Sequence, residues 1–136
     1  GVQGGELGVH GVSAIPPWIA KMHQSTEEEL AAALEAGYQQ VARAAVHCVL
    51  THVPPHGLGV DRAFFGRHLG SKALRAFVER REPALVVCGH IHEGRGVERV
   101  GRTTVVNCGY GAKGHYALVE VDHEVDHEVT VELRQA

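Results

Sequence analysis

Hydrophobic positions change their spacing along the chain, from a helical period in the first part to strand-like patterns later. Ser25, followed three residues later by Glu28, predicts the capping box that begins a first helix. The inward positions of this helix recur at helical spacing: Leu30, Leu34, Tyr38, Val41 and Ala45. A second helix is predicted from Ser71, its cap, to a stop at Pro83.

Short apolar runs predict the strands. Two runs are predicted to be buried strands, because apolar residues do not alternate regularly with polar ones in them: Val46–Thr51 and Ala84–Cys88. A weaker strand is expected at Leu7–Ser13, and Gly101-Arg102 predicts a hairpin turn. The remaining strands lie in the second half of the chain: Val97–Val100, Thr103–Asn107, Tyr116–Val121 and Val129–Leu133. This order predicts an α/β layered fold with a mixed β-sheet and two helices.

Composition narrows the class of protein. The chain has 136 residues, enough for one domain or part of one, with 44% hydrophobic and 21% charged residues. The net charge of −3 disfavours binding to a nucleic-acid scaffold. No apolar run approaches the ~20 residues of a membrane helix, and the N-terminus has no signal-peptide pattern, so we expect a cytoplasmic protein. An odd set of cysteines (Cys48, Cys88 and Cys108) without CxxC spacing predicts reduced thiols.

Histidine is the residue type that indicates a functional site, since the chain has eleven histidines and only three aspartates. His52 follows one predicted buried strand, and His90 follows the other. The carboxyl edge of an open α/β sheet is where ligands bind. His90 and His92 are one residue apart, so an extended segment would turn both rings to one side. Imidazole suits Zn, Fe, Ni and Cu, and these three histidines therefore predict a metal site.

Three segments together resemble a known family. Thr51-His52-Val53-Pro54-Pro55, Gly89-His90-Ile91-His92 and Asn107-Cys108-Gly109 resemble the C-terminal half of calcineurin-like metallophosphoesterases. The resemblance implies a layered αββα sandwich, of which residues 1–136 would form the C-terminal part of a single domain. It also implies a hydrolase that cleaves phosphodiesters or phosphomonoesters.

The resemblance also implies roles for individual residues. His52 and His90 would share one metal ion, and His92 would hold a second. The complete domain would contain two divalent ions (Mn, Fe, Zn or Ni) that polarise the phosphoryl group. His56, in the loop after His52, is the expected substrate-binding residue, with a solvated loop histidine as the alternative. No catalytic acid or base is assigned.

Several family motifs are missing. The N-terminal half of the family supplies Asp-x-His, Gly-Asp-x-x-Asp and Gly-Asn-His-Asp/Glu, and none of these occurs here. We therefore expect one ion or none in this chain alone, no activity of the isolated chain, and a partner: an N-terminal half or a second copy. A non-catalytic interaction module with an incomplete metal site is the main alternative. A mononuclear site of three histidines and zinc is a further one.

Three further polar residues could have either a role in the site or a structural role. His68 could face the site or cap a loop, and Asn107 could face the site or form a turn. His115 could reach a phosphate, although the glycine-rich segment before it lacks the Walker pattern and reads as a connector. The apolar flanks of Cys88 argue against a reactive thiol.

Overall fold

A computed structural model describes residues 7–12, 26–44, 46–89, 91–122 and 128–136. The predicted positions Ser25, Ala45 and His90 lie outside these residues. The two helices are α1 (Glu27–Val41) and α2 (Lys72–Arg81). The strands are β1 (Leu7–Val12), β2 (Val46–Thr51), β3 (Leu85–Cys88), β4 (Gly96–Val100), β5 (Thr103–Asn107), β6 (His115–Asp122) and β7 (Glu128–Gln135). Three short 3₁₀ turns complete the order: η1 (Phe64–Gly66), η2 (His92–Gly94) and η3 (Gly111–Lys113).

The strands form a five-stranded mixed sheet and a separate hairpin. The sheet order is β1-β2-β3-β5-β4, in which β1, β2, β3 and β5 run parallel and β4 runs antiparallel to β5. Strands β6 and β7 pair antiparallel. This arrangement confirms the predicted mixed α/β fold. Because parallel strands end at one edge, His52, Gly89 and Cys108 follow their strands at the same side of the sheet.

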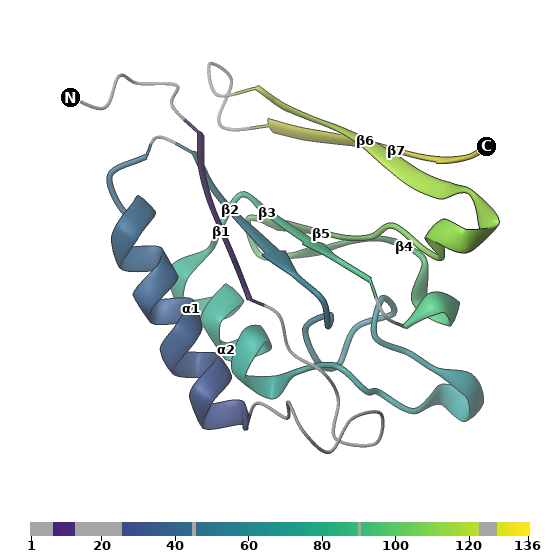
Figure 1. Ribbon diagram of the computed structural model, residues 1–136, viewed down its shortest axis with the longest axis horizontal. Helices are drawn as coiled ribbons and strands as arrows, with labels where there is room; N and C mark the ends of the chain where they lie inside the picture. The colour runs from purple at the N-terminus through teal and green to yellow at the C-terminus, as the bar shows by residue number, and fades with distance from the viewer. Residues whose placement is uncertain (1–6, 13–25, 45, 90, 123–127) are drawn as a thin grey trace.

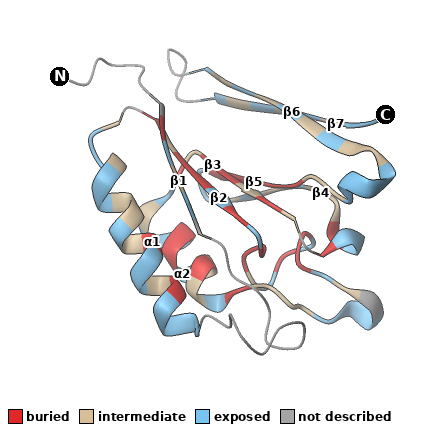
Figure 2. Cartoon of the chain, in the orientation of Figure 1, coloured by how far each residue is buried: buried red, intermediate tan, exposed pale blue. Residues whose placement is uncertain are grey.

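Two apolar layers hold these elements together. Helices α1 and α2 cover one face of the sheet, and the β6–β7 hairpin lies over the other (Figure 1). Burial is concentrated in the central strands and on the inner sides of the helices (Figure 2). Leu34, Leu74 and Phe77 fill the helix-side layer, whereas Val106 packs with Val119 and other hairpin residues on the opposite face. Among the described residues, no helix is long and apolar enough to cross a membrane.

The helix ends follow ordinary capping chemistry, with one correction to the predicted start. Helix α1 begins at Glu27, and its N-cap is Thr26, whose hydroxyl accepts a hydrogen bond from the Glu29 amide at 3.0 Å. The predicted cap Ser25 is one residue too early, because Ser and Thr are both suited to the role and the pattern could not choose between neighbours. In α2, Ser71 is the cap as predicted and accepts from the Leu74 amide at 3.0 Å.

A candidate metal-binding edge at the carboxyl ends of the sheet

The ends of β2 and β3 are joined by their backbones. The Gly89 amide donates to the His52 carbonyl at 3.2 Å, so the residues that follow the two strands lie next to each other. The His52 side chain is exposed, while Thr51 before it is buried and its hydroxyl donates to the Val53 carbonyl at 3.0 Å. This bond holds the turn after β2. The sheet therefore presents the His52 imidazole at its carboxyl edge.

His92 lies at the same edge but not in an extended segment. It begins the 3₁₀ turn η2, and the Ile91 amide donates to the Gly89 carbonyl at 2.7 Å. From His92 onward the chain is turned rather than extended, because the Gly94 amide donates to the Ile91 carbonyl at 2.9 Å. His92 is exposed and its ring stacks on Tyr110, with 4.1 Å between ring centroids and 13° between planes. His90 is not among the described residues, so its position relative to His92 stays a prediction.

Asn107 joins the loops at this edge through hydrogen bonds of its side chain. It is fully buried, and its side-chain amide donates to the Ile91 carbonyl at 2.7 Å and to the Val60 carbonyl at 3.0 Å. Its side-chain oxygen accepts from the Gly109 amide at 3.1 Å. All three contacts are to backbone, which favours the turn-forming reading of Asn107 over a role facing a ligand. The loop after β2 and the loop after β3 are thereby tied to each other.

The loop between β2 and α2 is organised by a buried carboxylate. Asp61 is fully buried and accepts hydrogen bonds from the amides of Leu58, Gly57 and Gly70 at 2.8, 3.0 and 3.1 Å. It also accepts from His68 Nδ1 at 2.7 Å. Burial alone would raise the pKa of Asp61, but His68 and the three amides outweigh it and lower this pKa overall.

His56 and His68 lie together beside this carboxylate. Their ring centroids are 5.7 Å apart and both residues are half-buried. Because His68 Nδ1 donates its hydrogen bond to Asp61, the other ring nitrogen, Nε2, is available for a further contact. The loop-capping reading of His68 is thus correct for one of its two nitrogens. The expected role of His56 in substrate binding remains a prediction.

The donor set at this edge suits a borderline metal ion. His52 and His92 are both exposed histidines at neighbouring strand ends, and imidazole binds Zn, Fe, Ni or Cu. Among the described residues, no group of three or more His, Cys, Asp or Glu side chains could hold a metal ion. The third predicted ligand, His90, stands outside that set. The chemistry of the two described histidines fits a divalent ion.

Two other sequence candidates have structural explanations. His115 Nδ1 accepts from the Tyr110 amide at 3.0 Å, which closes the turn before β6. Cys88 is buried, its Sγ donates to the Val106 carbonyl at 3.3 Å, and burial raises the pKa of its thiol far above neutrality. A thiol in that environment is not a nucleophile, in agreement with the reading from its apolar flanks.

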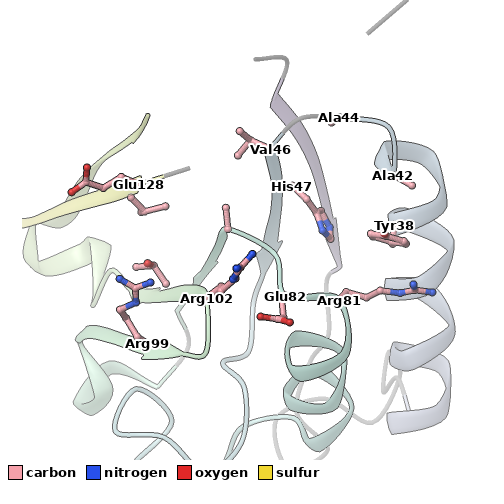
Figure 3. A pocket seen from close by; sticks show the side chains of 13 residues that line it. Tyr38, Ala42, Ala44, Val46, His47, Arg81, Glu82, Arg99, Arg102 and Glu128 are labelled. Atoms are coloured by element: carbon pink, nitrogen blue, oxygen red, sulfur yellow. The ribbon is translucent and has the colours of Figure 1, made fainter. Parts of the chain in front are cut away.

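A cavity of about 650 Å³ lies elsewhere, at the amino ends of the strands (Figure 3). Val46, Ala84 and Thr104, near the starts of β2, β3 and β5, contribute to its lining, and so do Arg99 and Arg102. None of the predicted site residues lines it. This hollow is therefore separate from the predicted metal edge.

Sequence reasoning missed two residues of the carboxyl edge. Asp61 was detectable as the one aspartate between the two histidine segments, within reach of His56 and His68 along the chain. Its preference for turns, where Asp binds nearby amides, was the available signal. Tyr110 carried no signal, because its stacking on His92 joins loops that only the folded sheet brings together.

Comparisons with known proteins agree with this fold. A family described as "Metallophosphoesterase, calcineurin superfamily" matches residues 34–132. The uncharacterized protein MJ1162 of Methanocaldococcus jannaschii is 35% identical over 63 residues, which are 43% of this chain and 29% of that protein. One crystal structure has a TM-score of 0.71 at 24% identity, and the match covers 94% of this chain and 49% of that one.

A second structure, a putative 5'-nucleotidase from Staphylococcus aureus in complex with alpha-ketoglutarate, has a TM-score of 0.56 at 19% identity. The match covers 98% of this chain and 28% of that one. At these identities the structures show the fold alone. The chain thus spans 29% of the length of the M. jannaschii relative, and 49% and 28% of these two solved structures.

Proposed function

We propose a function from the premise that this chain belongs to the calcineurin superfamily of metallophosphoesterases, whose family model covers residues 34–132. The function is metal-dependent hydrolysis of a phosphate ester, and the chain supplies one part of the site. The observation that carries this proposal is the pairing of the two strand ends. His52 and His92 are exposed there, and the Gly89 amide binds the His52 carbonyl at 3.2 Å.

In this proposal His52, His90 and His92 bind metal. His52 and His90 hold one divalent ion and His92 contributes to a second, and when bound these ions polarise the phosphoryl group. Asn107 fixes the His92 loop through the Ile91 carbonyl, and Tyr110 limits rotation of the His92 ring by stacking on it. A ligand held in one orientation binds metal with less loss of conformational entropy.

His56 is the proposed substrate-binding residue. It follows His52 by four residues and stands beside His68, whose Nδ1 is committed to Asp61. An imidazole at this position can donate a hydrogen bond to a phosphoryl oxygen. Asp61 keeps the loop that carries both histidines in one conformation, because it binds three of the loop's amides.

The rest of the site is proposed to come from another polypeptide segment. Three neutral imidazoles do not offset the charge of two divalent ions, so carboxylate ligands are needed from outside this histidine set. One face of the sheet also lacks complete cover: Val9 is 43% and Leu50 49% exposed, on the same face as the buried Cys48. An N-terminal half, or a second copy, packed there would supply both the missing anions and the cover.

The missing carboxylates also favour a second candidate, a non-catalytic interaction module on the same fold. Metal content separates the two. The phosphoesterase proposal predicts Mn²⁺-dependent hydrolysis of p-nitrophenyl phosphate or bis-p-nitrophenyl phosphate by the protein that carries this chain, lost by orders of magnitude in His92→Ala. His127→Ala, at a histidine to which the proposal assigns no role, serves as the control. Equal activity in both variants refutes the proposal, and absence of bound metal supports the module.

A further inference from the structure

A short projection leaves the loop between β2 and α2 and is called the 62–68 finger. Its two sides are joined by backbone hydrogen bonds: the Ala63 amide donates to the Arg67 carbonyl at 2.8 Å, and Arg62 and His68 form an antiparallel bridge. At its base the Leu69 amide donates to the Asp61 carbonyl at 3.1 Å. The carboxylate of Asp61 then fixes this base through its bonds to Gly70 and His68. The finger is therefore a preformed element.

The finger holds an aromatic side chain away from the protein. Phe65 is as exposed as a free side chain, at 101%, and its backbone is left-handed with φ 63° and ψ 20°. A bulky residue rarely adopts this conformation, because its Cβ crowds the backbone. Strain of this kind persists where neighbouring bonds impose it, and it is concentrated at binding sites. The finger thus keeps Phe65 in a position that neither packing nor local preference explains.

Positive charge accompanies the ring. Arg62 and Arg67 stand on opposite sides of the tip in the sequence and both are exposed. Within the described part of the chain, neither forms an ion pair or side-chain hydrogen bond that would neutralise it. An exposed aromatic ring on a short projection that also carries two exposed guanidinium groups suits a ligand with an aromatic part and an anionic part.

The finger is connected to the proposed phosphoester site. Val60, one residue before Asp61, accepts a hydrogen bond from Asn107, which also binds Ile91 next to His92. Gly94, in the η2 turn, packs so closely against the Val60 carbonyl that a Cβ there would collide with it. The loop itself begins directly after His52. The base of the finger and the two histidine loops are thus one bonded unit.

We propose that the 62–68 finger is a substrate-binding arm that selects phosphoesters with an aromatic alcohol portion. Phe65 packs against the aromatic ring, and Arg62 and Arg67 attract the negative charge of the ester. This inference rests on the proposed function, since the ester's phosphate must lie at the His52–His92 edge. Insertion into a lipid surface is the competing role, and the overall charge of −3 opposes attraction to anionic lipid.

The test compares two esters that differ in the ring. Phenyl phosphate, ethyl phosphate and inorganic phosphate are titrated, with Zn²⁺ present, into the ¹⁵N-labelled protein that carries this chain, and amide shifts are followed. We expect phenyl phosphate to bind about fivefold more tightly than ethyl phosphate, a gain typical of one aromatic contact. Phe65→Ala removes this selectivity and Phe65→Tyr restores it. Tyr116→Ala, at an exposed aromatic on β6, leaves it unchanged.

Each outcome decides between the claims. Equal binding of the two esters, or selectivity that survives Phe65→Ala, overturns the finger proposal while leaving the proposed function standing. If inorganic phosphate causes no shifts at residues 52, 89 and 92, the proposed function fails and the finger proposal fails with it. Phe65-dependent binding to vesicles containing anionic lipid, without ester selectivity, assigns the finger to a membrane surface and also overturns the proposal.

Discussion

At the scale of single residues, buried polar side chains determine the shape of the carboxyl edge. Asp61 and Asn107 are both fully buried, and each binds backbone groups from segments distant in sequence. A buried polar group is tolerated only when its hydrogen bonds are made, so each of these residues fixes the loops around it. The imidazoles of His52 and His92 depend on this framework for their positions.

The substitution Asp61→Asn tests this dependence. The new side-chain amide could not accept all four hydrogen bonds, because its nitrogen is a donor, and at least one buried amide would lose its partner. We expect the free energy of unfolding to fall by about 2 kcal/mol. Urea denaturation measures this change, with Glu120→Gln, at an exposed position of β6, as the control. An equal effect in both variants would contradict the assigned role.

Protonation gives an independent check on the same carboxylate. Its folded pKa lies below the ordinary value of 3.8, so its stabilisation is present above that pH. The stabilisation is lost as the pH falls through the lower folded pKa. The Asp61→Asn variant should therefore lose less stability than the wild type over this acid range, as measured by denaturation at several pH values.

The pair His10 and His47 gives the chain a second pH dependence. The Nε2 atoms are 2.6 Å apart, and burial, with smaller contributions from His10 and Arg81, lowers the pKa of His47 to about 4. The unfolded chain binds the proton near the ordinary pKa of 6.5, so it holds more protons than the folded chain between these values. We expect the free energy of unfolding to decrease as the pH falls from about 6.5 to about 4.

The variant His47→Gln isolates this effect, because Gln does not titrate and can still bond to His10. Its unfolding free energy should change less over the same pH range than that of the wild type. Chemical denaturation monitored by circular dichroism gives both curves. Parallel curves would show that His47 is not the group responsible.

At the scale of elements, one side chain links the N-terminal ends of the two helices. Glu27, in the first turn of α1, accepts from the Ser71 hydroxyl at 2.8 Å and from the Ala73 amide at 2.9 Å. It therefore stabilises the N-terminus of α2, where unpaired amides and the helix dipole favour an anion. Glu27→Ala should lower the unfolding free energy by about 1 kcal/mol, as urea denaturation would measure. Glu28→Ala, in the same turn of α1, is the matched control and should have little effect.

Periodicity predicted the elements well, for a physical reason. The central strands are buried on both faces and the helices on one, so β2, β3, α1 and α2 leave apolar patterns that can be read directly. The predicted site edge followed from the same argument, because parallel strands end on one side. The loops were less predictable. The turn at His92 is produced by local backbone bonds, and the Asp61 network joins segments that the sequence does not show as neighbours.

At the scale of the whole molecule, the chain resembles part of a larger fold. It spans 49% of one solved structure that it matches. On the face of the sheet that packs against the hairpin, Val9 and Leu50 are left exposed. We expect this face to bind an N-terminal half or a second copy. Sedimentation velocity should show a dimer or complex that Leu50→Glu weakens, whereas Glu120→Lys on the hairpin has little effect. A monomer at all concentrations, without a partner, would contradict this expectation.

We propose that His52 and His92 face one metal-binding site at the carboxyl edge. Titration of Mn²⁺ into the ¹⁵N-labelled protein that carries this chain tests this directly, since the ion broadens signals from nearby nuclei. We expect selective loss of the amide signals of residues 52, 53, 89 and 92, while residues 84 and 102–104 at the opposite edge stay sharp. The double variant His52→Ala/His92→Ala, which removes a ligand from each proposed ion, should abolish this loss. Uniform broadening, or none at residues 52 and 92, would contradict it.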